Sequence, residues 1–415
     1  MRFRWWAGGL LGLSWGGVAA LALLVVLVVL NVLFTVGVRE YHQFVYQADA
    51  FSNGQLYLRI LPEELVDLVK SGERYYSPLA PLPALLLVPF VALFGPLPFQ
   101  SYLYPVITLL VITLTYQLAK RRGYTTTNSL WLALAFTFAS VHLGVIFIPF
   151  AGQFSSTAAV VLSLATLYEY LGKRRFWLLG CLVGALFATH FTAGLVGLLV
   201  FADTALDAGI PWRERLQKLA RFLVPIVIVG SMLLWYNYAR FGNALDNGYM
   251  TALIRPEMQV NARAEYGLFN LKLIPSNIYH YFLAPPFPVI DPATLHLVPP
   301  YLKANLTMGF FLLSPIFLAI FFGLSFKDRF LKLTAIIALL MTLVLLSFFA
   351  INYFELGSRY LVDVLPLYFI LLLASFPGRI LLLRHRLLIF GSAVFNMWMF
   401  VTHPSFLAAL SKLPQ

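Results

Sequence analysis

The stretch SPLAPLPALLLVPFVALFG at residues 77–95 decides how the rest of the chain is threaded through a membrane. Its length and apolar character are typical of a membrane-crossing helix, although four prolines interrupt it. If residues 79–95 crossed the bilayer, the basic residues 120–122 would lie outside, whereas short basic loops usually remain in the cytoplasm. We therefore expect residues 79–95 to form an interfacial helix in the outer leaflet. The alternative is a crossing helix that is compensated by a re-entrant segment elsewhere.

About eleven other stretches are apolar enough to cross or nearly cross a bilayer, whose hydrocarbon core requires roughly 20 helical residues. They lie near residues 11–36, 100–119, 128–148, 153–171, 176–189, 190–206, 221–238, 306–325, 330–350, 360–377 and 386–403. Basic connectors between them are expected in the cytoplasm together with the N-terminus. These connectors are residues 2–4, 120–122, 173–175, 213–221, 327–332 and 379–386. The sequence thus predicts an all-helical polytopic membrane protein with about eleven transmembrane helices, within a range of roughly 10 to 13.

The composition agrees with a single membrane domain over residues 1–415, because 60% of the residues are hydrophobic and 11% are charged. Residues 38–99 and 239–305 then form two long outer loops. The net charge of +12 arises mainly in the cytoplasmic connectors, which face anionic lipid head groups. Because the chain has no basic domain, a nucleic-acid partner is not expected. A single cysteine, Cys181, excludes a disulfide framework.

Most of the acidic residues fall in the outer loops, and one of them stands apart. Four carboxylates of the first outer loop are expected to be solvated, because a charge run is usually a solvated face: Glu63, Glu64, Asp67 and Glu73. Glu40 instead follows the first span directly, so its carboxylate is held at the membrane interface. Such a group can act as a general base for a reaction near the lipid, and Asp49 is the reserve candidate.

The first outer loop resembles that of the C-type glycosyltransferases, the lipid-phosphosugar-dependent membrane enzymes that include protein O-mannosyltransferases and the bacterial lipid A aminoarabinose transferase. The similar segments are REYHQFVYQADAFSNGQLYL (39–58) and ERYYSPLAPLPALLLVPFVALFG (73–95). The resemblance implies that Glu40 takes the place of the family's acid, Gly54 that of its bend, and Pro81 that of its Pro-rich helix start. The family usually has Asp at the acid position, where this chain has Arg39-Glu40-Tyr41.

Two further segments resemble functionally unassigned bacterial and archaeal proteins of the same superfamily. They are WYNYARFGNALDNGY (235–249) and ELGSRYLVDVLP (355–366). Both contain an arginine at an outer boundary of a span. Arginine suits a phosphate leaving group, because its planar fork binds two oxygens and keeps its charge.

The donor phosphate is therefore expected near the outer arginines Arg359, Arg240 and Arg39, with Tyr360 beside them. Alternatives remain open at this point. Arg359 is either a phosphate clamp or an anchor paired with Glu355 or Asp363, and for Asp363 an i,i+4 pair with Arg359 is favoured. Arg240 has the alternative of snorkelling to the interface, with Asp246 as its nearest partner.

Aromatic residues crowd the outer loops, and an interfacial belt explains most of them. Tyr75 and Tyr76, with Pro81, are the candidates for an acceptor or lipid cleft beside the Pro-rich helix. The first outer loop contains no Asp-X-Asp pair, so a metal-independent reaction without a cofactor is expected. Asp203 and Asp207 share one helical face at the cytoplasmic side but have no third oxygen ligand nearby, so a divalent-metal site is not expected there.

These observations favour an integral membrane glycosyltransferase, transferring a hexose or a pentose, that uses a polyprenyl-phosphate sugar at the outer face of a prokaryotic plasma membrane. Glu40 is its expected general base, and the acceptor, whether glycan, lipid or protein, is left open. The alternatives are a lipid or sugar-lipid transporter and a non-catalytic member of the same fold. A transporter typically has charges in the middle of its spans, whereas here they lie at the ends.

Overall fold

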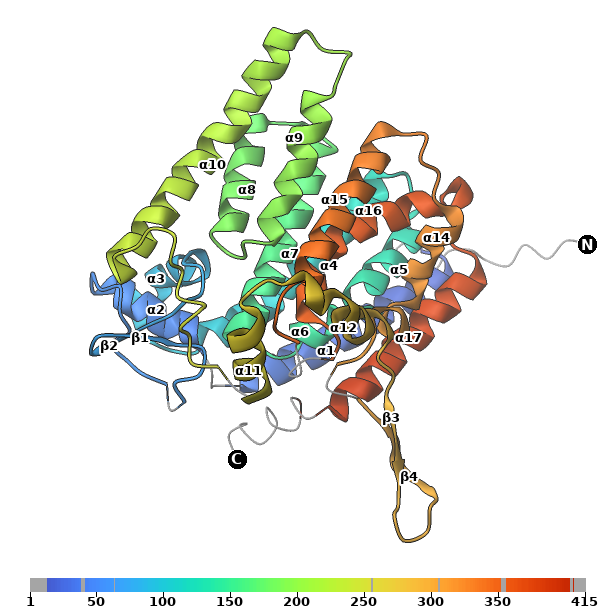
Figure 1. The fold of residues 1–415 in the computed structure, drawn as a ribbon. Coiled ribbons are helices and arrows are strands. Elements are labelled where there is room, and N and C mark those ends of the chain that lie inside the picture. The colour runs from blue at the N-terminus through green and yellow to red at the C-terminus, as the bar shows by residue number, and fades with distance from the viewer. Residues whose placement is uncertain are drawn as a thin grey trace, which may run out of the picture.

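Helices dominate the computed structural model, which describes residues 13–38, 42–62, 64–254, 257–304, 307–351, 356–403 and 406 (Figure 1). The α-helices are α1 (Trp15–Gly37), α2 (Gln43–Ser52), α3 (Leu82–Phe94), α4 (Phe99–Arg121), α5 (Thr126–Thr137), α6 (Leu143–Ile146), α7 (Ala151–Tyr170), α8 (Phe176–Phe187), α9 (Gly197–Ala205), α10 (Trp212–Phe241), α11 (Glu257–Tyr266), α12 (Ile274–Ile278), α13 (Phe310–Leu313), α14 (Ala319–Gly323), α15 (Arg329–Leu346), α16 (Leu365–Ser375) and α17 (Leu383–Val401).

Four of the described helices are long and apolar enough to cross a bilayer by length and composition, namely α1, α4, α10 and α15. Shorter apolar helices occupy several of the other expected spans, among them α8, the segment Ala193–Ala205 and α16. The protein is therefore a helical membrane protein, as predicted. The number of eleven crossings stays a prediction.

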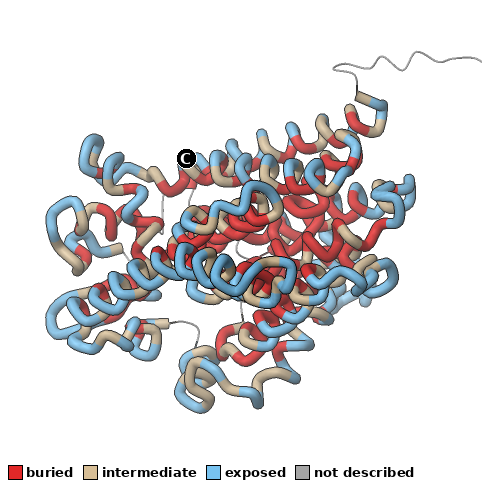
Figure 2. Tube along the Cα trace, turned by 90° about the horizontal axis from the view of Figure 1, so that it is seen from above, coloured by how far each residue is buried: buried red, intermediate tan, exposed pale blue. Residues whose placement is uncertain are grey.

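Helix α1 illustrates how the sequence suits a lipid environment. Its buried residues recur at spacings of three or four and form one stripe, composed of Gly17, Ala20, Leu24, Leu27, Asn31 and Thr35. Apolar residues such as Val25, Val29 and Leu33 are exposed on the rest of its surface. An apolar surface of this kind is costly in water and is natural against hydrocarbon chains. Figure 2 shows the same arrangement for the whole bundle, with buried residues gathered at its centre.

The Pro-rich stretch forms α3, a helix of 13 residues that packs against α2. Pro81 is the N-cap and Pro83 lies in the first turn, where a missing backbone N–H costs little, while Pro89 lies inside the helix. Gly95 ends the helix with a φ of 77°. At 1.5 Å per residue the helix is about 20 Å long, which is less than the roughly 30 Å of a hydrocarbon core. Its position in the outer leaflet stays a prediction.

The third expected span is broken into α5 and the short helix α6, and asparagines from distant helices bind carbonyl groups between the two helices and at the end of α6. Asn396 of α17 donates through Nδ2 to the carbonyl oxygens of Phe138 at 3.3 Å and Ser140 at 3.4 Å. Asn31 of α1 donates to the carbonyl oxygen of Ile146 at 2.6 Å. Irregular backbone is tolerated at this depth because protein groups satisfy it.

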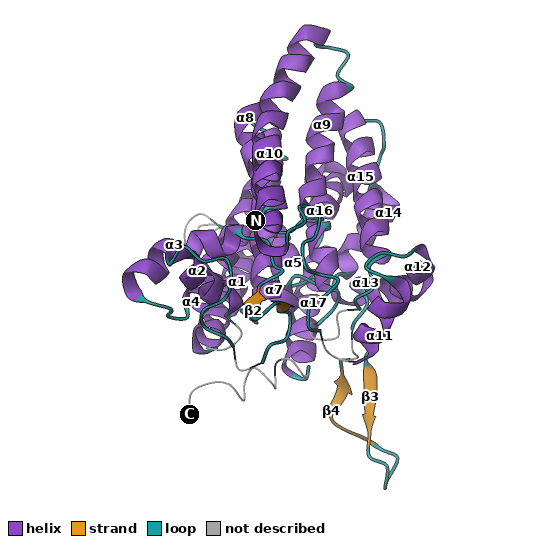
Figure 3. Ribbon diagram, turned by 60° about the vertical axis from the view of Figure 1, so that its left-hand side comes forward, coloured by secondary structure: helices purple, strands orange, loops and turns teal. Residues whose placement is uncertain are grey.

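Two small antiparallel sheets depart from the all-helical expectation. In the first loop β1 (Val69–Ser71) pairs with β2 (Arg74–Tyr76), and in the second loop β3 (Phe287–Ile290) pairs with β4 (Leu297–Lys303). The β3–β4 hairpin projects away from the helices (Figures 1 and 3). Both hairpins lie in the loops, where no lipid imposes helical structure.

The bundle has two ends of different character. The basic end carries the connectors α4–α5, α7–α8, α9–α10, α14–α15 and α16–α17, which contact one another; for example, Arg386 donates to Asn128 at 3.0 Å and Arg329 to Asp203 at 2.9 Å. The loop end carries α2, β1, β2, α3 and α11. Helix α10 runs from the basic end to the loop end beside α8 (Figures 1 and 3).

Candidate functional site

Backbone hydrogen bonds join the two long loops at the loop end. The backbone amide of Asp67 donates to the carbonyl oxygen of Leu253 at 2.6 Å. The backbone amide of Leu253 donates in turn to the carbonyl oxygen of Leu68 at 2.8 Å. Asp67 has a φ of 60°, in the left-handed region that few non-glycine residues adopt. Close by in the second loop, the carbonyl oxygen of Tyr249 accepts a hydrogen bond from Arg263 at 2.9 Å. The loop pairing thus brings Asp67 and Tyr249 to the same region.

Arg359 reaches this region from the other side of the bundle. It begins the 3₁₀ turn η6 (Arg359–Asp363), which packs against α7. Its guanidinium lies on Gly152 in the first turn of α7, so closely that a Cβ at residue 152 would be 2.0 Å from Nη1. The guanidinium carbon lies 5.3 Å from the centre of the Tyr360 ring. The arginine charge and the positive end of the α7 dipole therefore reinforce each other here.

Asp67, Tyr249, Arg359 and Tyr360 form what we call the loop-end cluster. Part of the Asp67 side chain is accessible to solvent. The protein groups around its carboxyl group displace water and so raise the pKa of Asp67, whereas the positive charge of Arg359 lowers it. Burial, reinforced by Tyr360 and Asp67, raises the pKa of Tyr249, while Arg359 and Arg240 lower it. Tyr249 is therefore a neutral phenol at neutral pH. The four side chains lie within electrostatic reach of one another.

This combination of groups suits a phosphorylated sugar substrate. A guanidinium can donate two parallel hydrogen bonds to a phosphate. A neutral phenol can donate to and accept from a sugar hydroxyl, and a carboxylate can accept a proton or a hydroxyl hydrogen bond. Neither Asp67 nor Tyr249 was singled out by the sequence, since their proximity depends on the fold.

Arg240 is buried at the end of α10, with 6% of its surface exposed. It donates through Nη1 to the carbonyl oxygen of Ser77 at 2.5 Å and through Nη2 to Oδ1 of Asn237 at 2.7 Å. Its guanidinium carbon lies 3.8 Å from the centre of the Tyr236 ring. The expectation of a snorkelling side chain is wrong, because these contacts hold Arg240 inside the protein. Asp246, the expected partner, lies within electrostatic reach of its guanidinium. Arg240 ties the segment before α3 to α10.

Asp363 is buried and contacts the loop after α8. Its Oδ2 atom lies 2.7 Å from Nδ1 of His190 and accepts a hydrogen bond from the hydroxyl of Thr192. The expected i,i+4 ion pair with Arg359 is therefore wrong. The reason is the 3₁₀ geometry of η6, in which three residues rather than 3.6 complete a turn, so side chains four apart do not lie above each other. Glu355, the other expected partner, lies outside the described residues.

The aromatic cleft candidates differ in accessibility. Tyr76 is buried and packs edge-on against Phe241, with ring centres 5.6 Å apart. Tyr75 is half-buried on β2, opposite Lys70 of β1. Pro81 is buried at the start of α3. Tyr76 and Pro81 thus belong to the wall of the loop end, and Tyr75 is the accessible member of the three.

Glu40 and Arg39 lie outside the described residues, and the residues that flank them are held by α4. The hydroxyl of Ser101 donates to the carbonyl oxygen of Val38 at 2.6 Å. The same hydroxyl oxygen lies 2.9 Å from Nε2 of His42. Since the Ser101 proton is given to Val38, we assign the second bond to donation by Nε2–H of His42. The two ends of the segment that carries Glu40 are therefore attached to one point on α4.

Asp49, the reserve acid, has an ion partner of its own. Its Oδ2 atom lies 3.9 Å from Nη1 of Arg59, and Nδ2 of Asn53 donates to Oδ1 at 3.5 Å. These contacts connect the end of α2 to the chain that follows it.

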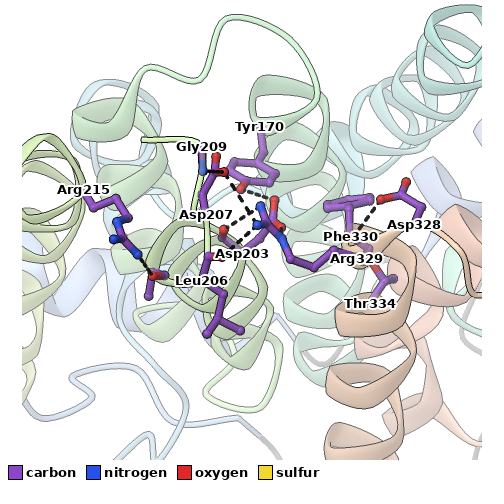
Figure 4. A network of polar contacts seen from close by, with 11 residues as sticks. Tyr170, Asp203, Leu206, Asp207, Gly209, Arg215, Asp328, Arg329, Phe330 and Thr334 are labelled. Atoms are coloured by element: carbon purple, nitrogen blue, oxygen red, sulfur yellow. Dashed lines mark hydrogen bonds and ion pairs between the residues drawn. The ribbon is translucent and has the colours of Figure 1, made fainter. Parts of the chain in front are cut away.

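At the basic end, Asp203 and Asp207 converge on Arg329 (Figure 4). Oδ1 of Asp203 lies 2.9 Å from Nε of Arg329, and Oδ1 of Asp207 lies 3.6 Å from Nη1. The hydroxyl of Tyr170 donates to Oδ2 of Asp203 at 2.6 Å. The expectation of one shared helical face is wrong, because α9 ends before Asp207. Within the described ranges, no three or more His, Cys, Asp or Glu side chains are grouped to hold a metal ion.

Comparison with known proteins identifies the fold. No protein-family model and no curated protein matches the chain. The structure is similar to the crystal structure of ArnT from Cupriavidus metallidurans bound to undecaprenyl phosphate, with a TM-score of 0.52 and 12% identity over 91% of this chain and 63% of that chain. It is also similar to ArnT from the same organism in the apo state, with a TM-score of 0.54 and 14% identity over 95% of this chain and 78% of that chain.

At these identities the likeness concerns the fold. It confirms, at that level, the resemblance to the C-type glycosyltransferases that the first outer loop indicates. The chain spans less than two thirds of the lipid-bound ArnT chain.

Proposed function

We propose that the protein is a glycosyltransferase that takes a sugar from a polyprenyl-phosphate donor at its loop end, on the non-cytoplasmic side of a prokaryotic plasma membrane. The observation that carries the proposal is the loop-end cluster, which joins a guanidinium, a phenol and a carboxylate on a fold similar to ArnT. An ArnT structure with bound undecaprenyl phosphate supports the choice of a lipid-phosphate donor.

Arg359 is proposed to bind the donor phosphate. The bond between the sugar C1 and the phosphate oxygen breaks in the reaction, and its electron pair stays with the phosphate, whose negative charge therefore grows. Two parallel hydrogen bonds from the guanidinium stabilise that charge. Tyr360 lies at the side of the guanidinium, and Arg39 is the second proposed cation. Because these groups supply the positive charge, we propose that the reaction needs no metal ion.

Glu40 is proposed as the general base. It removes the proton from an acceptor hydroxyl while the hydroxyl oxygen forms its bond to C1 of the sugar. Asp67 and Tyr249 are proposed to bind hydroxyl groups of the transferred sugar. The ion pair with Arg59 makes Asp49 the weaker candidate for the base.

The lipid tail is proposed to leave the site beside α3, with Tyr76 and Pro81 in the wall and Tyr75 facing the acceptor. Arg240 holds that wall through its hydrogen bond to Ser77. Its proposed effect on the donor phosphate is thus one of position rather than direct contact.

The test is a transfer assay with purified protein in lipid nanodiscs and a panel of polyprenyl-phosphate hexoses and pentoses. Release of free polyprenyl phosphate is measured for the wild type, Glu40→Gln and Glu73→Gln. Glu73 is an exposed acid of the same loop and serves as the matched control. Loss of the base should slow release about 10²- to 10⁴-fold, and the control should retain the wild-type rate.

Two results would contradict the proposal. A Glu40→Gln rate within a few-fold of the wild type would remove this residue from the base position. Movement of an intact donor across the bilayer, with its sugar still attached, would assign the protein to the transporters.

A further inference from the structure

A recess of about 320 Å³ opens at the basic end of the molecule, between the α7–α8 turn and the first turns of α10. Its charged lining consists of Lys173, Arg174, Arg175, Lys218, Arg221 and Asp207. Cations therefore outnumber carboxylates five to one around this recess.

Two of the five cations already have carboxylate partners. Nη2 of Arg175 lies 2.9 Å from Oε2 of Glu169, and Nζ of Lys218 lies 2.7 Å from Oε1 of Glu214. Such pairs leave little positive charge for a ligand. They also fix the two sides of the recess, one on α7 and the other on α10.

The other three cations make no ion pair within the described chain: Lys173, Arg174 and Arg221. The one carboxylate in the lining, Asp207, lies 3.6 Å from Arg329 and is shared with that residue. The recess thus keeps an excess of positive charge that no protein group within ion-pair distance neutralises. Concentrated like charge is unfavourable, and a bound anion relieves it.

Arg174 is held in position for such a ligand. Its φ of 52° gives the α7–α8 turn a sharp bend. Its Nε donates to the carbonyl oxygen of Tyr170 at 3.0 Å, and its guanidinium carbon lies 4.8 Å from the centre of the Tyr170 ring. Tyr170 is in turn bound to Asp203, as Figure 4 shows. Because these contacts order the side chain in advance, a ligand loses less entropy when it binds.

A neighbouring recess of about 340 Å³ provides an internal comparison. The cations in its lining are Arg122, Arg174 and Arg329, and the carboxylates are Asp203 and Asp328. Arg329 is bound to Asp203 there (Figure 4). That recess shares Arg174 with the first recess and has three cations to two carboxylates, so the larger excess of positive charge lies in the recess between the α7–α8 turn and α10.

We infer from the length of α10 that the recess lies at the level of lipid head groups. Arg221 and Arg240 are separated along α10 by roughly 28 Å, which is close to the thickness of a hydrocarbon core. Trp177 lies in the first turn of α8 and Trp212 begins α10, and these side chains are 54% and 64% exposed. Exposed tryptophan at helix ends is typical of the membrane interface.

We propose that this recess binds the phosphate group of an anionic membrane lipid. Lys173, Arg174 and Arg221 would contact the phosphate oxygens, and the apolar side chains of Phe176 and Ile210 at the recess would face the glycerol and acyl region. A soluble phosphate has the same charged group but no acyl chain, so the lipid is the favoured source. The site is independent of the proposed transferase, because it lies at the opposite end of α10.

Native mass spectrometry of the delipidated full-length protein tests the proposal. The probes are phosphatidylglycerol, phosphatidylcholine and inorganic phosphate. Lys173→Gln/Arg221→Gln removes two recess cations that make no ion pair, and Lys120→Gln/Lys327→Gln removes the same charge from exposed positions of the basic end outside the recess. Equal melting temperatures establish that both variants fold. Should the double variant not fold, Arg221→Gln is compared with Lys327→Gln.

We expect the recess variant to lose phosphatidylglycerol affinity about tenfold or more, and the control variant to stay within about twofold of the wild type. Three results would overturn the proposal. Equal losses in the two variants would mean general surface attraction, equal binding of phosphatidylcholine would mean that the anion is not recognised, and equal affinity for inorganic phosphate would exclude a lipid as the ligand.

Discussion

At the scale of single residues, Arg359 distinguishes a donor clamp from a structural anchor. Arg359→Lys keeps the charge and loses the planar fork, so donor affinity should fall about tenfold or more. Arg359→Ala also removes the charge, so its donor affinity should fall further than that of Arg359→Lys. Donor affinity and melting temperature are measured on both variants.

Arg74→Lys is the control for that experiment, because it makes the same change at an exposed arginine. The guanidinium carbon of Arg74 lies 4.4 Å from the centre of the Tyr57 ring. A lower melting temperature in Arg359→Ala combined with unchanged donor affinity would make Arg359 an anchor.

His42 links pH to stability at the segment that carries Glu40. Burial lowers the pKa of His42 from 6.5 to about 4, so the folded protein keeps the imidazole neutral against Ser101. Below pH 6.5 the unfolded chain takes up a proton that the folded protein does not. The stabilising contribution is therefore present above pH 6.5 and is lost as the pH falls toward 4.

His42→Gln removes this titration and retains a donor for Ser101. We expect the melting temperature to fall less between pH 7.5 and pH 5 in this variant than in the wild type. An identical fall in the two proteins would mean that other groups control the acid response.

At the scale of elements, the first turn of α7 should position Arg359. A Cβ at residue 152 would meet the guanidinium of Arg359 at 2.0 Å, so Gly152→Ala must displace that flexible group. We expect weaker donor affinity and a nearly unchanged melting temperature, since alanine also favours the helix. Gly230→Ala in α10 is the control, because its Cβ would meet no atom within 4 Å. Normal donor affinity in Gly152→Ala would separate the α7 turn from the donor site.

The elements also show what the sequence can predict. Apolar runs predicted the helices, because each helix satisfies its own backbone and shows its lipid face in its composition. The break between α5 and α6 was not predicted, since Asn396 completes it from a helix that is distant in the sequence. For the same reason Asp67 was grouped with solvated acids. Its neighbours Tyr249 and Arg359 meet it only through the pairing of the two loops and the packing of η6 on α7.

At the scale of the whole molecule, the position of α3 determines the topology. Cys181 is exposed and is replaced first, by serine. Glu73→Cys and Lys120→Cys then carry single thiols at exposed positions of the loop end and the basic end. In intact cells an impermeant maleimide should label the first variant, and it should label the second only after permeabilisation. Labelling of Lys120→Cys in intact cells would mean that α3 crosses the membrane.

The central claim is that the loop end binds a polyprenyl-phosphate donor through Arg359. A cryo-EM structure of the protein in nanodiscs with undecaprenyl phosphate tests this most directly. The account predicts phosphate density within hydrogen-bonding distance of the Arg359 guanidinium and near Gly152, with the lipid tail leaving beside α3. Phosphate density away from Arg359, or lipid density that continues through the bundle from the loop end to the basic end, would contradict it.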